Sequence, residues 1–353
     1  MKKFIISKNE LKKILAGIVA ENIKLIAPVS RDNAFFLEEV SDAEKIAWDY
    51  SNVVKPVKEH IFPMREVLLD FGRGTDPPAL DEPEARSSGK EKNPAGNMPP
   101  VKEQVIFGLR PCDARSLLVL DKPFLQEKYV DSYYKERREK TTLIAMACLN
   151  PEKTCLCSSF ENGGPFSSAG SDVLCVQTGQ DEFLVEILSE KGEKIFKNPS
   201  FAQPSGEVLK KLENLKADSE AKICKALKVP ENLRELFEAG TWETESLSCI
   251  ACGICRYLSA TCYCFNITDE FEQRLRYWIP CSFKNYTKMT SGEISREKKS
   301  ARFKHWYFHK FSYHKDNFGE YLCVGCGRCI KYCPVKIDFT EVLGKIGNSK
   351  QEQ

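Results

Sequence analysis

The sequence predicts an α+β protein with two domains, a mixed α/β N-terminal domain followed by a mainly helical domain rich in cysteine. Apolar runs of strand length alternate with helical patterns in the first part of the chain, and a cysteine motif occurs twice after residue 246. With 353 residues, of which 42% are hydrophobic, the chain can form more than one core. We expect the domains to span residues 1–245 and 246–345, with a flexible tail over 346–353.

The N-terminal domain begins with a predicted helix over residues 7–21. Ser7 and Glu10 have the spacing of a capping box, and the apolar residues that follow lie on one helical face. Residues 72–100 are rich in Pro, Gly, Ser and charge, so they bury too little apolar area to become ordered, and we expect a mobile surface loop. Strand-length apolar runs lie at 23–27, 35–37, 105–109, 143–146 and 183–188.

The charge balance and the first residues indicate the cellular setting. The chain has 52 basic and 50 acidic side chains, which gives no general reason to expect nucleic acid or a membrane surface as a partner. Near the N-terminus, only residues 4–6 form an apolar run, which is too short for a signal peptide, and no window has the roughly 18 apolar residues of a membrane span. We expect a cytoplasmic protein, in which the sixteen cysteines favour metal binding over disulfides.

The second cysteine motif has the C-x2-C-x2-C-x3-C-P spacing of bacterial ferredoxins, which hold [4Fe–4S] clusters. Gly325 and Gly327 lie between its cysteines and allow the backbone to approach a cluster closely. A zinc site is the alternative, but zinc ribbons use two C-x2-C pairs rather than a triple followed by C-P. The motif comprises Cys323, Cys326, Cys329 and Cys333.

The first cysteine motif matches at three positions, Cys249, Cys252 and Cys255, and has Ser259 at the fourth. In two-cluster ferredoxins the fourth cysteine of each motif ligates the other cluster. Cys333 should therefore complete the cluster of the first motif, which leaves the cluster of the second motif one thiolate short. Cys262 or Cys264 could move in, Cys281 could fold over, Ser259 could bind through oxygen, or the cluster could lack one iron. We favour Cys262.

Four further cysteines predict a third [4Fe–4S] cluster in the N-terminal domain. Cys112 directly follows the run at 105–109 and Cys148 directly follows the run at 143–146, so neighbouring strands would bring the two together. Cys155 and Cys157 would add two thiolates from a loop, which completes the four that a cubane needs. The alternative is that each is an inert buried thiol.

Taken together, these motifs resemble the iron–sulfur β subunits of cytoplasmic sulfhydrogenases and the corresponding iron–sulfur chain of anaerobic sulfite reductase. The resemblance implies a ferredoxin-like dicluster domain and a hetero-oligomeric complex. In such a complex an FAD-binding flavoprotein subunit takes electrons from NAD(P)H, and this type of subunit passes them to a catalytic redox partner. Ser259 and Ala260 depart from the family's Cys-Pro. The resemblance rests on residues 108–117, 131–139, 148–165, 249–265 and 323–334, and on Arg276, Trp278, Cys281, Met289, Arg302, His309, Lys310 and Tyr313.

We therefore expect a non-catalytic electron-transfer subunit whose partner is a hydrogenase, a sulfite reductase or a heterodisulfide-reductase-like complex. No G-x-G-x-x-G turn is visible, so NAD(P)H binding by this chain is not expected. A rival hypothesis is an oxidoreductase subunit that binds flavin or an anionic substrate through Arg110, Asp113, Arg115 and residues 137–138. The basic and aromatic stretch 296–315 could bind nucleic acid, but we favour a helix with its aromatic face packed near the clusters.

Overall fold

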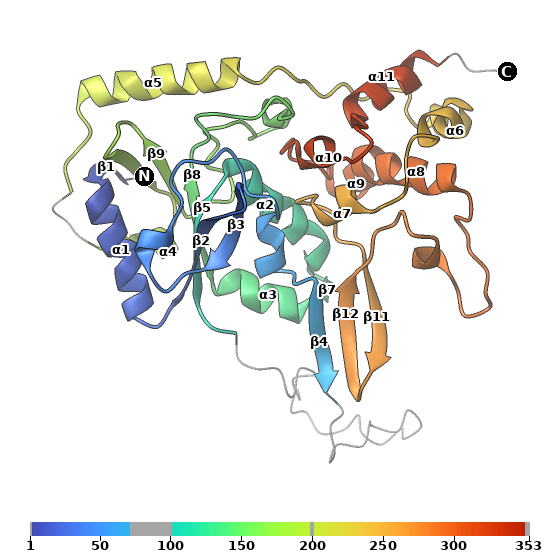
Figure 1. The fold of residues 1–353 in the computed structure, drawn as a ribbon, viewed down its shortest axis with the longest axis horizontal. Helices are drawn as coiled ribbons and strands as arrows, with labels where there is room; N and C mark the ends of the chain where they lie inside the picture. The colour runs from blue at the N-terminus through green and yellow to red at the C-terminus, as the bar shows by residue number, and fades with distance from the viewer. Residues whose placement is uncertain (1, 71–100, 198–200, 350–353) are drawn as a thin grey trace.

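The computed structural model describes residues 2–70, 101–197 and 201–349, and it has the predicted α+β character (Figure 1). A large sheet with its helices forms the N-terminal part, and short helices with a small sheet form the C-terminal part. The loop predicted at 72–100 lies outside the described residues. None of the helices in the described part of the chain combines the length and apolar character needed to cross a bilayer.

The N-terminal part is built on a seven-stranded sheet with the order β1-β10-β9-β8-β5-β2-β3. Its central strands β2, β5, β8 and β9 are parallel, whereas β10, β1 and β3 pair antiparallel at the edges. Apolar side chains on the two faces of the sheet form two separate cores. The strands are β1 (Lys2–Ser7), β2 (Lys24–Arg31), β3 (Ala34–Glu39), β5 (Gln104–Leu109), β8 (Thr141–Met146), β9 (Val173–Gln177) and β10 (Glu182–Ile187).

The helices of this part cover both faces of the sheet (Figure 1). Helix α1 begins with the predicted capping box, because the Ser7 hydroxyl accepts from the Glu10 amide while the Glu10 carboxylate accepts from the Ser7 amide. Helix α2 begins with Pro111 at its first turn, directly after β5. The remaining elements are α1 (Lys8–Ala20), α2 (Pro111–Phe124), β6 (Leu125–Gln126), β7 (Tyr129–Val130), α3 (Ser132–Glu139), α4 (Glu190–Ile195) and α5 (Gly206–Ala221).

The C-terminal part is mainly helical, as predicted. Residues 299–318 form one continuous helical segment, in which α8 passes through a π-helical stretch, His309–Tyr313, into α9. Phe303, Trp306 and Phe308 of this segment are buried, which agrees with the packing helix favoured above. The elements are α6 (Thr241–Ser246), α7 (Ile254–Tyr257), β11 (Phe265–Glu270), β12 (Gln273–Trp278), α8 (Lys299–Phe308), α9 (His314–Phe318), α10 (Arg328–Lys331) and α11 (Phe339–Asn348).

Helix α11 corrects one predicted boundary. It runs to Asn348, so residues 346–348 are helical rather than part of a flexible tail, because Ile346 is buried in the core of the C-terminal part. Residues 350–353 lie outside the described residues. The domain boundary near residue 245 stays a prediction.

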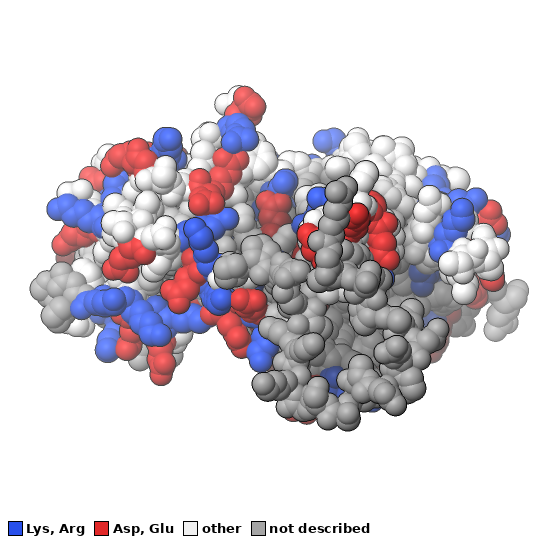
Figure 2. Space-filling view, turned by 90° about the horizontal axis from the view of Figure 1, so that it is seen from below, with Lys and Arg blue, Asp and Glu red and all other residues white. Residues whose placement is uncertain are grey.

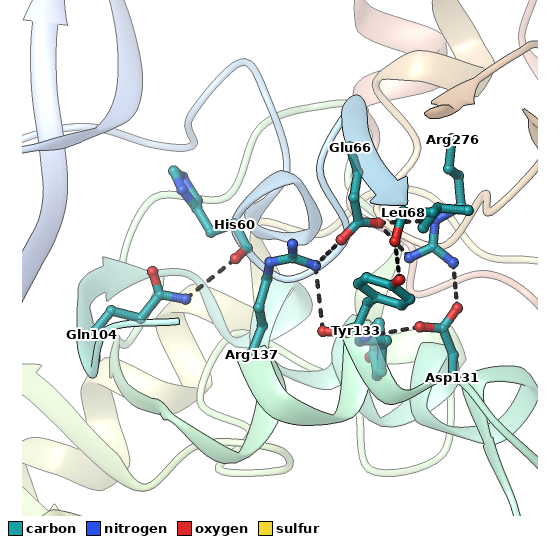
Figure 3. A network of polar contacts seen from close by, with 9 residues as sticks. His60, Glu66, Leu68, Gln104, Asp131, Tyr133, Arg137 and Arg276 are labelled. Atoms are coloured by element: carbon teal, nitrogen blue, oxygen red, sulfur yellow. Dashed lines mark hydrogen bonds and ion pairs between the residues drawn. The ribbon is translucent and has the colours of Figure 1, made fainter. Parts of the chain in front are cut away.

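The two parts are joined by a shared sheet and by a buried polar network. Strand β4 (Arg65–Asp70) belongs to the N-terminal half of the sequence, but it pairs with β12. Strand β12 in turn lies between β4 and β11 in a three-stranded sheet. Glu66 on β4 faces Arg137 of α3 and Arg276 of β12, and Asp131 reaches Arg276 from the start of α3 (Figure 3). Because these charges are buried and compensate one another, the network holds β12 against the N-terminal part.

The visible surface shows no separation of charge by sign. Seen from below, Lys and Arg side chains are interspersed with Asp and Glu side chains over the described surface (Figure 2). This pattern agrees with the formal net charge of +2.

Candidate iron–sulfur centres

A first cavity lies at the carboxyl ends of the parallel strands β5 and β8. It is lined by Cys112, Cys148, Cys155 and Cys157. Cys112 lies in the first turn of α2 after β5, and Cys148 follows β8, so the adjacent strands bring the two thiols to one edge of the sheet. The loop with Cys155 and Cys157 closes over them. The structure thus gathers all four N-terminal cysteines that the sequence singled out.

The electrostatics of this cavity suit ligands that lose a proton on binding metal. Burial raises the pKa of the Cys157 thiol to about 11, and it also raises the pKa of Cys112 and Cys155. Without a cation these thiols remain protonated at neutral pH. Iron bound there would have to displace these protons, so binding and proton release would be coupled.

The C-terminal part contributes one wall of the first cavity. Gly325 and Cys326 line it together with the four N-terminal cysteines, and the Leu156 amide donates to the Gly325 carbonyl at 2.9 Å. Gly325 has a φ of +68°, and a Cβ there would lie 2.5 Å from the Leu156 carbonyl oxygen. Only glycine fits this close approach.

A second cavity is lined by Cys249, Cys252 and Cys255 together with Cys333. This is the crossover arrangement expected from the sequence, because the fourth cysteine of one motif joins the first three of the other. The Ala251 amide donates to Cys249 Sγ at 3.4 Å, and the Ile337 amide donates to Cys333 Sγ at 3.3 Å. Such amide donors to sulfur are typical of iron–sulfur sites.

Arg256 is the cation of the second cavity. Its guanidinium is buried and donates to Cys255 Sγ at 2.7 Å. A fixed positive charge beside a ligating sulfur stabilises the thiolate and offsets negative charge in the site.

A third cavity is lined by Cys323, Cys326 and Cys329, and its remaining polar lining includes Ser259 and Lys310. Ser259 therefore lines the site to which the crossover rule assigns a fourth ligand from the first motif. Cys262, which we favoured for that role, lines a different cavity with Cys264 and Lys58.

Cys281 lies beside this smaller cavity, close to Cys264. A hydrogen bond from Cys264 and the nearby Arg256 guanidinium lower the pKa of the Cys281 thiol to about 6. Neither Cys264 nor Cys281 lines the third cavity.

The first, third and second cavities share walls and in that order form a row. The first and third share Gly325 and Cys326, and the third and second share Trp306, Cys329 and Phe339. Among the described residues, no three His, Cys, Asp or Glu side chains are grouped so as to hold a single metal ion.

Comparison with known proteins bears on the two C-terminal cavities. Residues 248–337 match the family of 4Fe-4S dicluster domains. The chain is also 26% identical over 336 residues to sulfhydrogenase 2 subunit beta of Pyrococcus furiosus, with 92% of each chain covered. The chain is a sulfhydrogenase β-like iron–sulfur subunit. The resemblance predicted from the sequence is thereby confirmed, and this β-like chain is a metal-binding subunit with two [4Fe–4S] clusters in its C-terminal part. No solved structure matches it.

Sequence reasoning gave no separate role to two residues of the β-like chain's site, although Lys310 was among the residues that carry the resemblance. Lys310 and Arg256 each face a cysteine-lined cavity, and nothing in the spacing of the motifs marks either side chain as special. Arg256 directly follows Cys255, so its place beside that sulfur is set by the short helix α7. Lys310 comes from a segment some 13 residues before Cys323 and lies in the π-helical stretch.

Proposed function

We propose that this chain relays single electrons between an NAD(P)H-linked, FAD-binding flavoprotein and a catalytic redox subunit, through three [4Fe–4S] clusters in a row. The observation that carries the proposal is the sharing of walls between consecutive cavities, which places each site directly beside the next. Bound clusters supply reversible one-electron chemistry, whose potential depends on ligand type, hydrogen bonds to sulfur and burial.

The ligand sets follow from the cavity linings. Cys249, Cys252, Cys255 and Cys333 would hold one cluster, and Cys323, Cys326 and Cys329 would supply three ligands of the next. Cys112, Cys148, Cys155 and Cys157 would hold the third, since four thiols facing one closed cavity fit the donor set of a cubane.

One end of the row lies near the protein surface. Cys252 is exposed, and beside it Leu247 and Ile250 have 74% and 61% of their surface accessible. Apolar residues exposed next to a redox site are suited to contact with a partner protein, because docking there brings the partner close to the terminal site. We propose that a partner docks at this end.

The rival hypothesis of an N-terminal site for flavin or an anion is disfavoured by the contacts of its residues. The Arg110 guanidinium donates to the carbonyl oxygens of Ser51 and Ala147, at 2.8 and 2.9 Å. Asp113 is paired with Arg328, and Arg115 donates to Glu161 and Glu320. These side chains are bound to partners within the protein.

Iron analysis of the anaerobically purified chain tests the relay. Three clusters of four irons predict about twelve irons per chain, whereas two predict about eight. Replacing Cys112 and Cys148 together by Ser should remove about four irons and leave the C-terminal sites filled. Cys224, which is exposed and lies outside all three cavities, provides the control, since Cys224→Ser should change nothing. About eight irons in the unaltered chain would eliminate the N-terminal cluster.

Electron flow is tested separately from cluster content. The chain with its clusters should be reduced by NAD(P)H in the presence of the flavoprotein, and it should then reduce the catalytic partner. NAD(P)H oxidation by this chain alone, or a flavin absorption band, would favour the rival hypothesis instead.

A further inference from the structure

The third cavity has one ligand position that is not a cysteine. Cys323, Cys326 and Cys329 provide three sulfurs, and the Ser259 side chain faces the same cavity at the position of the missing fourth thiolate. Ser259 is itself buried, and so are the neighbouring residues Ala260 and Thr261. Solvent therefore has little access to this corner of the site.

The Ser259 oxygen is surrounded by hydrogen-bond donors. It accepts from the Thr261 amide at 3.3 Å, from the Cys262 amide at 3.2 Å and from Lys310 Nζ at 3.1 Å. A neutral hydroxyl oxygen has two lone pairs, whereas an alkoxide has three. Three N–H donors directed at one oxygen therefore favour its anionic form.

Lys310 carries a buried charge with no carboxylate partner among the described residues. Only 3% of its surface is accessible, and its ammonium donates to Ser259 Oγ, to Thr261 Oγ1 at 3.1 Å and to the Leu322 carbonyl at 2.7 Å. All three acceptors are neutral oxygens as long as Ser259 keeps its proton. A buried ammonium is costly unless negative charge lies nearby, and here the nearby groups that can supply it are the cysteines around it, Cys262 as well as those that line the cavity.

Lys310 lies near the start of the π-helical stretch His309–Tyr313. Such π-turns are frequent at functional sites. The preceding turn still packs Trp306 and Phe308 into the core, while Lys310 points to Ser259.

We propose that Ser259 ligates the fourth iron of the cluster held by Cys323, Cys326 and Cys329 through its oxygen, and that Lys310 is the cation that holds this oxygen in place. The inference rests on the proposed function. On assembly an Fe–O bond forms, the O–H bond of Ser259 breaks, and its proton leaves to solvent. Lys310 retains its contacts with Thr261 and Leu322, and its charge offsets that of the alkoxide.

Cys262 is the competing ligand. Its amide is bound to Ser259, but its side chain lines the neighbouring cavity with Cys264. To ligate the fourth iron it would have to leave that cavity and displace Ser259 from its donors. The geometry therefore assigns the position to Ser259.

The test uses the full chain with clusters assembled anaerobically, and three variants read by iron analysis, EPR and Mössbauer spectroscopy. Ser259→Ala should lose about one iron per chain and show, when oxidised, the EPR signal of a three-iron cluster. Ser259→Cys should keep every iron and raise the reduction potential of this one cluster, because sulfur is a softer and less basic donor than oxygen. Cys262→Ala is the matched control and should retain the iron content and spectrum of the unaltered chain.

Two results would overturn the assignment. The first is loss of one iron in Cys262→Ala with none in Ser259→Ala, which would make Cys262 the ligand. The second is an unchanged potential in Ser259→Cys, which remains informative if Ser259→Ala does not fold. An unaltered chain that takes up no C-terminal clusters would refute the proposed function instead.

The role of the Lys310 charge is tested by a separate variant. Lys310→Met removes the charge while keeping most of the side-chain volume, and we expect full iron content with a lower potential for this cluster only. A purely structural role for Lys310 would change stability and leave the potential where it was.

Discussion

The buried ion pair between Arg328 and Asp113 makes the contact between the two parts of the chain measurable. Arg328 lies between Cys326 and Cys329, and it donates to both carboxylate oxygens of Asp113, at 2.8 and 2.7 Å. The accessible fractions of the two side chains are 2% and 0%. Arg328→Ala leaves the Asp113 carboxylate buried without its partner, which costs about 3–5 kcal/mol. The substitution also removes the hydrogen bonds that Arg328 donates to the Asn52 side chain and the Val53 carbonyl, which adds to this cost.

Urea unfolding under anaerobic conditions, followed by circular dichroism and by the visible absorbance of the clusters, measures this cost. Arg31→Ala is the control, because its ion pair with Glu38 is on the surface and should contribute less than about 1 kcal/mol. The double variant Arg328→Met with Asp113→Leu should be more stable than Arg328→Ala, since it buries no unpaired charge. A loss below about 1 kcal/mol in Arg328→Ala would refute the reasoning.

Three further predictions concern other contacts. Glu66→Ala should lower the free energy of unfolding by about 3 kcal/mol, because it leaves the buried Arg276 and the nearby Arg137 without a shared carboxylate, and urea unfolding again measures it. Gly325→Ala should lower the iron content of the first and third cavities, because the added Cβ would lie 2.5 Å from the Leu156 carbonyl oxygen. The control is Gly319→Ala, which should leave the iron content unchanged, because Gly319 also has a positive φ, +82°, but no atom lies within 4 Å of the added Cβ. Burial lowers the pKa of His60 from 6.5 to about 4, so the folded state keeps this imidazole neutral while the unfolded state binds a proton. The unaltered chain should therefore lose up to about 1.4 kcal/mol per pH unit, relative to His60→Gln, as the pH falls from 6.5 to about 4. Equal pH profiles for the two proteins would contradict that assignment.

Much of the N-terminal fold could be predicted because its signals are local. The capping box of Ser7 and Glu10 lies at the start of α1, and all five predicted apolar runs lie within β2, β3, β5, β8 and β10 or reach one residue beyond their ends. The juxtaposition of Cys112 and Cys148 followed from the same strands, since parallel neighbours end at one edge. Strand β11 was missed because it is polar and mostly exposed, and β12 was missed because its pairing with β4 depends on residues some 200 positions apart.

The grouping of cysteines around a cavity was predictable where spacing alone brings them together. The presence of Cys333 in the cavity of Cys249, Cys252 and Cys255 is such a case. The fourth ligand position of the other C-terminal site could not be predicted. Four residues, Ser259, Cys262, Cys264 and Cys281, were candidates for it, and only the path of the backbone determines which of them faces the cavity. Lys310 lies in a π-turn, for which the sequence offers no periodic signal.

The close fit of Gly325 against Leu156 has a consequence for the order of assembly if the proposed N-terminal cluster is present. The N-terminal cysteines leave the ribosome well before residue 325, and at about 5–20 residues per second the interval is on the order of 10–30 s. Throughout that interval their cavity lacks the wall that Gly325 and Cys326 provide. Iron delivered early would meet an open site exposed to water and oxidants. Under the proposed function, stable loading of the N-terminal site would therefore follow docking of the last cysteine motif rather than synthesis of the first.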